Sequence, residues 1–271
     1  MQIVSTVSEL SRSTANAFAP LYIIHPVVRS ADLATVAEVA RLRPVYTVCD
    51  HYVHAEWVSR LAVQNGITIN ILIEINTGLN AFGIRPGADL RELSQGLVTL
   101  PGLTMQGMAT RLEPLRILTP TYEQIEYYVP QPREIDHAVG LLNEMSGRMF
   151  AERLVGSARY LITQCPSESE GVTCLNGESS PSPLPANPPE ITATVLSRSK
   201  LERAVIDVGD CVGAGPWTFA TGYGRPLKQC RFERIASNFS TLYLGPDSQN
   251  LRIGDELRIY VRGIANPLSN P

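Results

Sequence analysis

Four histidines supply most of the acid–base chemistry open to this 271-residue chain, and all four precede residue 138. His25 ends an apolar run and stands directly before Pro26. In α/β barrels the active site forms at the C-terminal ends of the strands, so His25 is the first catalytic candidate. Arg111, followed closely by Glu113, comes after a later apolar run and could line the same opening. The alternative for His25 is a hydrogen-bonded structural histidine.

His51 and His54 form a second candidate site, beside Asp50 and Glu56. Histidines three residues apart share a helix face, and with a carboxylate they could ligate a metal ion. The same segment is the expected start of a helix, where Asp50 would cap the first turn. We favour the capped helix over the metal site and expect no bound metal.

Lysine is scarce, because 21 of the 23 basic residues are arginine. The two lysines, Lys200 and Lys228, both stand in the last third of the chain. Arginine keeps its proton and cannot replace a lysine amine as a nucleophile. A mechanism that needs such an amine therefore has two candidates in this sequence.

The composition argues against several classes of partner. A net charge of −3 favours neither nucleic acid nor an anionic membrane surface. No apolar run reaches the ~18 residues of a membrane-spanning helix, and the N-terminus does not resemble a signal peptide. The five cysteines show neither paired nor zinc-ribbon spacing, so we expect reduced thiols. These features predict a cytoplasmic protein.

Apolar runs alternate with segments of helical period in the first 110 residues. The runs span residues 21–25, 44–49, 67–75 and 103–110. Ser30 is the expected N-cap of the first helix and Gly66 the expected C-cap of the second. Strand–helix–strand units of this length form parallel sheets with right-handed crossovers. Residues 1–175 therefore predict an α/β domain, an incomplete (β/α)8 TIM-barrel-like one.

The remaining segments predict a second domain. Residues 111–133 contain several prolines and tyrosines and predict a long loop, with a helix over 134–154 behind it. Residues 176–190 form a Pro- and Ser-rich linker. Short segments separated by turns follow in 191–271 and predict a small antiparallel β-domain.

Several segments are similar, in order along the chain, to one known family. EINTGLNAFGIRPG (74–87) resembles the E-x-x-T-G-M-x-R-x-G-x-x-P-G stretch of fold-type III pyridoxal-phosphate enzymes, the alanine racemase-like barrels. IIHPVVRSADL (23–33), ITATVLSRSKLERAVIDVG (191–209) and LRIGDELRIYV (251–261) resemble the branch that contains D-threonine aldolase and D-serine dehydratase. The resemblance implies pyridoxal phosphate as cofactor and cleavage or elimination on a D-β-hydroxy amino acid.

Residues that the family uses around the cofactor are replaced here. The resemblance places the Schiff-base lysine on a strand that would precede Met1, and the ring-supporting arginine at Ala81. The tyrosine and histidine that follow the next strand would fall near Arg111 and Pro114. We therefore expect no bound cofactor.

The family's metal ligands are replaced as well. Its late histidine-containing pair would fall at Ile264 and Asn266, and Phe239 stands in the place of an upstream histidine. Isoleucine and phenylalanine have no electron pair to donate to zinc or manganese. The resemblance therefore predicts that this metal site is missing.

The family's phosphate-binding turn has a partial counterpart in this chain. The candidate residues are Asn176, Gly177, Ser179 and Ser180, with Ser182 after them. Backbone amides and hydroxyls in such a turn bind a phosphate, but Glu178 in its middle would repel one. We favour a flexible linker over a phosphate site at this position.

These observations favour a degenerate, non-catalytic relative of the D-threonine aldolase and D-serine dehydratase branch. Two alternatives stay open: an active pyridoxal-phosphate-dependent lyase or aldolase whose lysine is supplied elsewhere, and a regulatory or binding subunit of an active paralogue. The expected small-molecule ligand is an amino acid. A missing barrel strand would leave strand edges without a partner, so we expect a homodimer that fills the gap.

Overall fold

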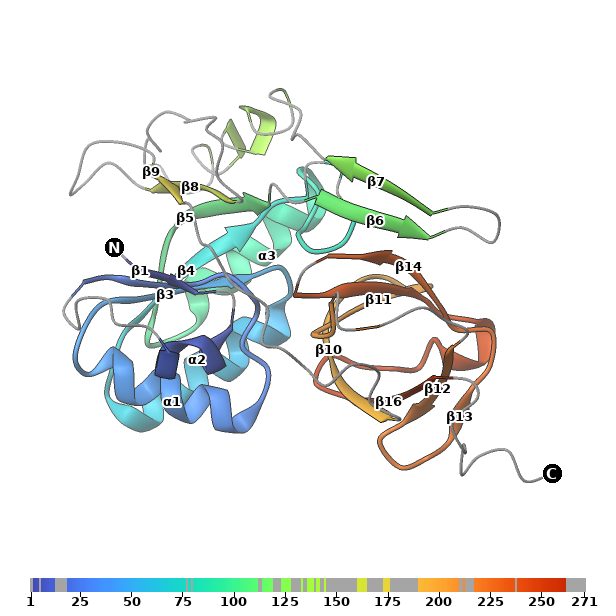
Figure 1. Ribbon diagram of the computed structural model, residues 1–271. Coiled ribbons are helices and arrows are strands. Elements are labelled where there is room, and N and C mark those ends of the chain that lie inside the picture. Colours follow the sequence, from blue (N-terminus) through green and yellow to red (C-terminus); the bar gives the residue numbers. More distant parts are fainter. Residues whose placement is uncertain are drawn as a thin grey trace. The chain divides into compact units, whose positions relative to one another are not determined.

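The chain divides into two units, Met1–Leu112 with Val129–Ser179, and Glu113–Tyr128 with Ser180–Pro271 (Figure 1). Each unit has its own sheet and its own apolar core. The computed structural model describes residues 2–4, 6–12, 19–76, 78, 80–111, 114–118, 123–127, 133, 136–138, 140–141, 144, 160–164, 173–175, 190–209, 212, 217–236 and 238–261.

A seven-stranded sheet forms the first unit, in the order β1-β2-β3-β4-β5-β8-β9. Neighbours from β1 to β5 pair in parallel, whereas β8 and β9 run antiparallel to their neighbours. The strands are β1 (Gln2–Val4), β2 (Leu21–Ile23), β3 (Val45–Cys49), β4 (Ile69–Glu74), β5 (Leu103–Arg111), β8 (Tyr160–Gln164) and β9 (Thr173–Leu175). The central strands are rich in Val and Ile because both faces of a parallel sheet are covered.

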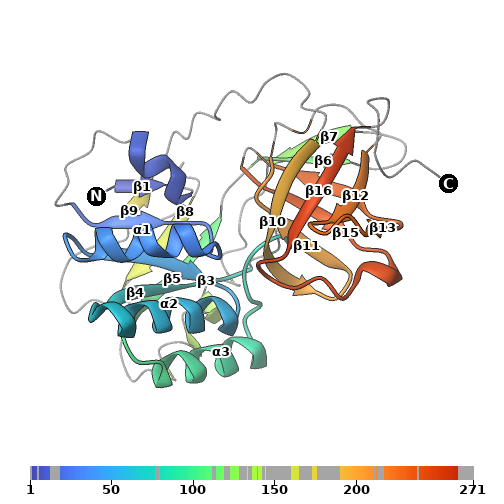
Figure 2. The same cartoon turned by 90° about the horizontal axis from the view of Figure 1, so that it is seen from below.

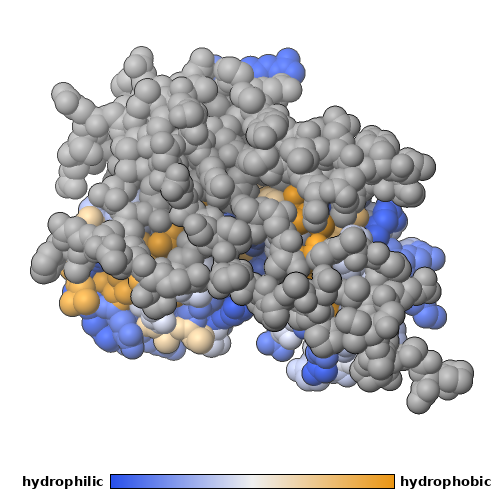
Figure 3. Space-filling view, viewed as in Figure 1, coloured by the Kyte–Doolittle hydropathy of each residue, from blue (hydrophilic) through white to orange (hydrophobic). Residues whose placement is uncertain are grey.

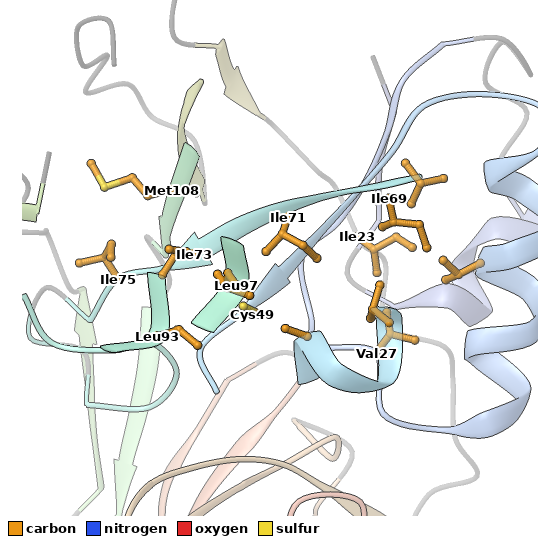
Figure 4. Close-up of a cluster of buried hydrophobic side chains, with 14 of the residues drawn as sticks. Ile23, Val27, Cys49, Ile69, Ile71, Ile73, Ile75, Leu93, Leu97 and Met108 are labelled. Atoms are coloured by element: carbon orange, nitrogen blue, oxygen red, sulfur yellow. The ribbon is translucent and has the colours of Figure 1, made fainter. Parts of the chain in front are cut away.

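Three helices cover one face of this sheet and lie side by side in Figure 2: α1 (Ser30–Ala40), α2 (Tyr52–Asn65) and α3 (Ala88–Thr99). A short 3-10 helix, η1 (Val7–Arg12), follows β1. Alternate residues of β4, Ile69, Ile71 and Ile73, belong to the core that also contains Leu93 and Leu97 of α3 (Figure 4). The opposite face carries a smaller apolar cluster of Tyr22, Tyr46, Val48, Leu72 and Ala109.

Two predicted helix ends have different outcomes. Gly66 is confirmed as the C-cap of α2, with φ at 62° in the left-handed region that glycine adopts without strain. Ser30 is wrong as an N-cap, because α1 already begins at Ser30 and its N-cap is Arg29, which makes no side-chain capping bond. Asp32 in the first turn of α1 interacts favourably with the free backbone amides at that end of the helix instead.

A nine-stranded antiparallel sheet forms the second unit, in the order β13-β12-β16-β10-β11-β15-β14-β6-β7. Its strands are β6 (Pro114–Leu118), β7 (Glu123–Tyr127), β10 (Glu190–Lys200), β11 (Arg203–Ile206), β12 (Trp217–Thr221), β13 (Pro226–Leu227), β14 (Arg231–Ile235), β15 (Ser240–Tyr243) and β16 (Glu256–Val261). A 3-10 turn, η2 (Pro246–Ser248), precedes β16. The predicted antiparallel architecture after residue 191 is confirmed.

The predicted loop over 111–133 is wrong, because this segment contains a β-hairpin. β6 pairs with β7, and β6 also adds to β14 through the pairs Arg234↔Ile117 and Ile235↔Arg116. The strand that holds the hairpin lies far along the chain, so local sequence carried no sign of the pairing. Residues 113–128 therefore belong to the second unit although they interrupt the first.

The α/β class of the first unit is confirmed, but a closed (β/α)8 barrel is not. β8 runs antiparallel to β5, whereas neighbours in such a barrel are parallel. Of the helix predicted over 134–154, residues 136–138, 140–141 and 144 are described and helical. The predicted linker, apart from Glu190 at the start of β10, lies outside the described residues, and the predicted domain limits stay a prediction.

The described surface is mixed in character. On the face drawn in Figure 3, hydrophilic side chains alternate with small apolar patches. Exposed large apolar side chains include Leu42, Val63 and Val98, which stand in or just after the last turns of α1, α2 and α3. Among the described helices, none is both long and apolar enough to cross a membrane.

Candidate functional site at the C-terminal edge of the parallel sheet

Buried polar side chains gather where the parallel strands of the first unit end. Because β2 to β5 run in parallel, their C-terminal ends meet at one edge of the sheet, where α/β proteins usually bind ligands. The buried side chains are His25 after β2, Asp50 after β3, Glu74 at the end of β4 and Thr110 in β5. We call these four residues the C-terminal edge.

His25 lies at this edge, as the sequence predicted, but it is only 2% exposed. Its ring stands 5.5 Å from the ring of Phe82, at an angle of 31° between the planes. Phe82 is itself 1% exposed. A catalytic role for His25 stays a prediction, and it requires Phe82 to move before a ligand can reach the imidazole.

Asp50 makes two contacts at the edge, both away from solvent. Its Oδ1 lies 3.2 Å from Nδ1 of His54, and the two side chains are 2% and 1% exposed. Its Oδ2 accepts a hydrogen bond of 2.9 Å from the backbone amide of Gly83. Hydrogen bonds to charged groups are the stronger kind, and water cannot compete for them here. Asp50 therefore ties α2 to the segment after β4.

That segment, residues 75–87, connects β4 to α3, and we call it the glycine loop. Ile75 and Ile84 form a parallel bridge across it, and the Asn76 amide donates to the Ile84 carbonyl at 2.8 Å. Gly83 has φ at 93°, and a Cβ there would lie 2.6 Å from the Asn76 nitrogen. Only glycine fits this close approach of two backbone segments.

The first half of the glycine loop is held by a side-chain amide. Asn76 is 7% exposed, and its Oδ1 accepts hydrogen bonds from the amides of Gly78 and Asn80. Asn80 adopts φ at 54°, a conformation that asparagine tolerates better than most residues. Arg85 then donates from Nη2 to Oδ1 of Asn80 at 3.0 Å. The described residues of the loop are therefore held in place by side chains of the loop itself.

Cys49 precedes Asp50 and is not suited to nucleophilic chemistry. Burial raises the pKa of its thiol, and the neighbouring carboxyl groups of Asp50 and Glu74 raise it further. The thiolate is the reactive form of cysteine, so this side chain stays uncharged and unreactive at neutral pH. Its place in the apolar core with Ile71 and Ile73 agrees with a packing role.

The predicted capping role of Asp50 is wrong, because its carboxyl oxygens face His54 and Gly83. His51 caps α2 instead, and its Nδ1 accepts a hydrogen bond of 3.2 Å from the Val53 amide. Burial lowers the pKa of His51, His54 lowers it further, and Asp50 opposes both effects. Among the described residues, no group of three or more His, Cys, Asp or Glu could hold a metal ion.

The other predicted site residues fall into three groups. Ala81 and Phe239 are fully buried, and Arg111 ends β5 at the edge, but its side chain is not described. Lys200 and Lys228 are exposed, at the β10–β11 hairpin and in the turn after β13. Outside the described residues lie Glu113, Asn176, Gly177, Glu178, Ser179, Ser180, Ser182, Ile264 and Asn266.

Sequence reasoning missed Glu74 and Thr110 as members of the edge. Both stand at the end of an apolar run that was predicted as a strand, so the available signal was a polar residue at a strand terminus. The Asp50–Gly83 contact had no such signal, because it joins residues 33 apart in the chain.

Comparison with known proteins agrees with this arrangement. Residues 2–130 match the family model of the alanine racemase N-terminal domain. Part of the chain is similar to D-threonine aldolase from an Arthrobacter species, with 29% identity over 102 residues. That match covers 38% of this chain and 27% of the aldolase, so it spans about a quarter of this curated relative.

Residues 2–130, slightly less than half of the chain, are therefore similar to the alanine racemase-like family of fold-type III pyridoxal-phosphate proteins, as the sequence predicted. Within that family, the predicted resemblance to the D-threonine aldolase branch is confirmed by the match to the Arthrobacter protein.

The comparison with solved structures includes three proteins with TM-scores below 0.5. D-threonine aldolase from Filomicrobium marinum is 16% identical, with 96% of this chain and 72% of that chain covered and a TM-score of 0.39. Alanine racemase from Clostridium difficile 630 is 14% identical, with 96% and 73% covered and a TM-score of 0.42. D-threo-3-hydroxyaspartate dehydratase from Delftia sp. HT23 is 13% identical, with 96% and 82% covered and a TM-score of 0.34. Because all three TM-scores are below 0.5, these structures carry no argument about this chain. The resemblance to the family rests on the sequence matches.

Proposed function

We propose that this chain is a D-threonine aldolase- and D-serine dehydratase-like protein without catalytic activity of its own. The position of its amines carries the proposal. Residues 1–199 contain no lysine, and Lys200 and Lys228 are exposed at turns of the antiparallel sheet. A Schiff base with pyridoxal phosphate requires a primary amine beside the cofactor aldehyde. The C-terminal edge, where His25, Asp50, Glu74 and Thr110 stand, offers none.

Pyridoxal phosphate is the family's cofactor, and the described residues do not fit it. Ala81 occupies the place of the arginine that supports the cofactor ring, and its methyl group is fully buried and cannot donate a hydrogen bond. The edge also holds two buried carboxyl groups, Asp50 and Glu74, which disfavour an anionic ligand nearby. We derive no chemical step through this cofactor.

A second candidate is an active lyase or aldolase whose lysine is supplied elsewhere, by another chain or by a longer form of this one. The glycine loop favours it, because Thr77, Gly78, Gly83, Pro86 and Gly87 match the family's pattern. In that case the described residues form part of a site whose lysine comes from elsewhere. A regulatory subunit of an active paralogue has the same requirement for a partner.

The expected partner is a second copy of this chain. In the described part of the first unit, β1 ends the sheet and pairs with β2 only. Strand edges carry unpaired N–H and C=O groups, which a further strand can satisfy. A homodimer that pairs through the free edge of β1 is therefore part of the proposal. Light scattering after size-exclusion chromatography measures the oligomeric state.

The test of the proposed function is borohydride reduction after incubation with pyridoxal phosphate, followed by peptide mass mapping. We expect no stoichiometric adduct and no glycine released from D-threonine. The matched control is the K200R/K228R double variant, which keeps both charges and removes both amines.

Each outcome of this test has a definite meaning. Identical results for the control and the natural chain support the proposal. A fold-dependent adduct on either lysine, or aldolase activity that the double variant lacks, would overturn it. Activity that appears only with an in-frame upstream extension ending in lysine would establish the second candidate.

A further inference from the structure

Asp50 contacts two separate segments of the first unit through its two carboxyl oxygens. Its Oδ1 lies 3.2 Å from Nδ1 of His54 in the first turn of α2, and its Oδ2 accepts from the Gly83 amide at 2.9 Å. We propose that Asp50 is a bridge that couples the first turn of α2 to Gly83 in the segment after β4, so that loosening either contact loosens the other. This inference does not depend on the proposed function.

The Gly83 end of the bridge stands at a close approach of two backbone segments and next to a buried phenylalanine. Gly83 lies against the beginning of the loop, where a Cβ would be 2.6 Å from the Asn76 nitrogen and 2.7 Å from the Ile75 carbonyl carbon. Phe82, the preceding residue, is 1% exposed and stands against the ring of His25. If Gly83 leaves this position, Phe82 must move with it, and His25 becomes accessible.

The His54 end of the bridge reaches into the helix layer. His54 is 1% exposed, and its neighbour Ala55 belongs to the apolar core under the sheet. His54 also meets the ring of His51, the N-cap of α2, with ring centroids 6.2 Å apart. A change at the start of α2 therefore reaches Asp50 directly, and coupling between two sites acts equally in both directions.

Burial strengthens the contacts of Asp50, as a comparison with an exposed ion pair in α2 illustrates. Glu56 and Arg60 are also four residues apart and have a shorter contact of 2.7 Å, but their side chains are 37% and 64% exposed. Water and salt weaken an exposed pair of this kind. The Asp50 carboxyl group has no comparable access to water, so removing one contact changes the strength of the other.

The experiment measures amide hydrogen exchange of Gly83 by NMR in protein labelled with 15N-glycine, which reduces the spectrum to the 20 glycines. Exchange of Gly107 in β5 serves as the internal reference. We expect D50A to accelerate Gly83 exchange by about tenfold or more, because a hydrogen bond to a charged group is lost. We expect H54A to accelerate it severalfold, although the substituted side chain belongs to α2.

Two control variants separate coupling from a general loss of stability. S59A removes another buried tether of α2, the 2.7 Å bond from Ser59 Oγ to the Pro101 carbonyl, which lies at the opposite end of the strands. E56Q breaks the exposed pair with Arg60. Neither variant should accelerate Gly83 relative to Gly107. If S59A accelerates Gly83 as much as H54A does, the proposal is wrong.

D50N keeps the experiment decisive if D50A does not fold. Asparagine retains one oxygen for the Gly83 amide but loses the charge that joins it to His54. We expect D50N to accelerate Gly83 exchange severalfold, as H54A does, and adding H54A to this variant should have no further effect. Acceleration by H54A in the D50N background would show that the coupling does not pass through Asp50, and would overturn the proposal.

Discussion

In the first unit, four ionisable side chains are buried near one edge of a parallel sheet, whereas in the second unit the acidic side chains whose burial is described are partly or fully exposed. His25, Asp50, His54 and Glu74 are each at most 8% exposed. The clearest ion pair of the second unit, Arg203 with Glu233, has side chains 25% and 22% exposed. Burying ionisable groups is costly, so their concentration in one place is the reason that the candidate site is placed in the first unit.

The largest effect expected is a loss of stability when a residue of either apolar core is replaced. Ile73 and Leu242 are both fully buried, in clusters that share no described residue. Replacing either by alanine should destabilise its own unit by about 2–5 kcal/mol, because a cavity remains. Urea unfolding followed by separate probes in each unit should show two transitions, with only one shifted in each variant. A single transition that both variants shift equally would contradict separate cores.

A smaller difference is expected between the buried and the partly exposed pairs. D50A should lower the free energy of unfolding by about 1.5–3 kcal/mol, because it removes a charged acceptor for the Gly83 amide. E233A removes the acceptor of the 2.7 Å bond from Arg203 Nε and should cost less than about 1 kcal/mol. Chemical denaturation of both variants measures the two values. Equal losses of unfolding free energy would mean that burial does not make the contacts of Asp50 stronger than those of Glu233.

The two cysteines whose surroundings are described should differ in reactivity. Cys49 is fully buried in the first unit and the pKa of its thiol is raised by burial, then by Asp50 and Glu74. Cys230 in the second unit is only partly buried. With a thiol reagent at pH 8, Cys49 should react at least about tenfold more slowly than Cys230, because the thiolate is the reactive form. Peptide mass mapping of timed samples assigns the two rates, and urea should abolish the difference.

The smallest effect is a dependence on pH that comes from His51. Because burial and His54 lower the pKa of His51 in the folded chain, the unfolded chain binds the proton first as the pH falls below about 6.5. Stability from this group is therefore present at neutral pH and declines in acid. H51N keeps a capping acceptor and should remove less than about 0.5 kcal/mol of the decline between pH 7 and 5, since the residue is partly exposed. An unchanged pH profile in H51N would show that His51 does not contribute.

The parallel part of the fold was predictable from sequence because it is built from local patterns. The apolar runs at 44–49, 67–75 and 103–110 match β3, β4 and β5 to within two residues at each end, and the helical segments predicted between the runs are α1, α2 and α3. A run of Val and Ile between two amphipathic helices is compatible with few structures other than a buried parallel strand. The hairpin β6–β7 and the antiparallel strand β8 were not predictable in this way, because their partners are distant in the chain.

The candidate site was predictable only in outline. Polar residues after apolar runs pointed to His25 at the correct edge, since strand ends can be located from sequence alone. Asp50 was assigned to a helix cap by its local context, and the structure gives that role to His51. A side chain that bonds to Gly83 and His54 at once depends on tertiary packing, which overrides a local preference worth only about 1 kcal/mol.

The pairing of Ile117 with Arg234 also has a consequence for synthesis of the protein. At ~5–20 residues per second, the roughly 117 residues between them take a ribosome about 6–23 s to add. Throughout that time β6 has been synthesised and its partner strand β14 has not. The parallel strands β1 to β5 are complete earlier and can associate as they emerge. The nascent chain therefore carries an unpaired hairpin edge beside folded structure, which makes this interval the one in which a chaperone is most needed.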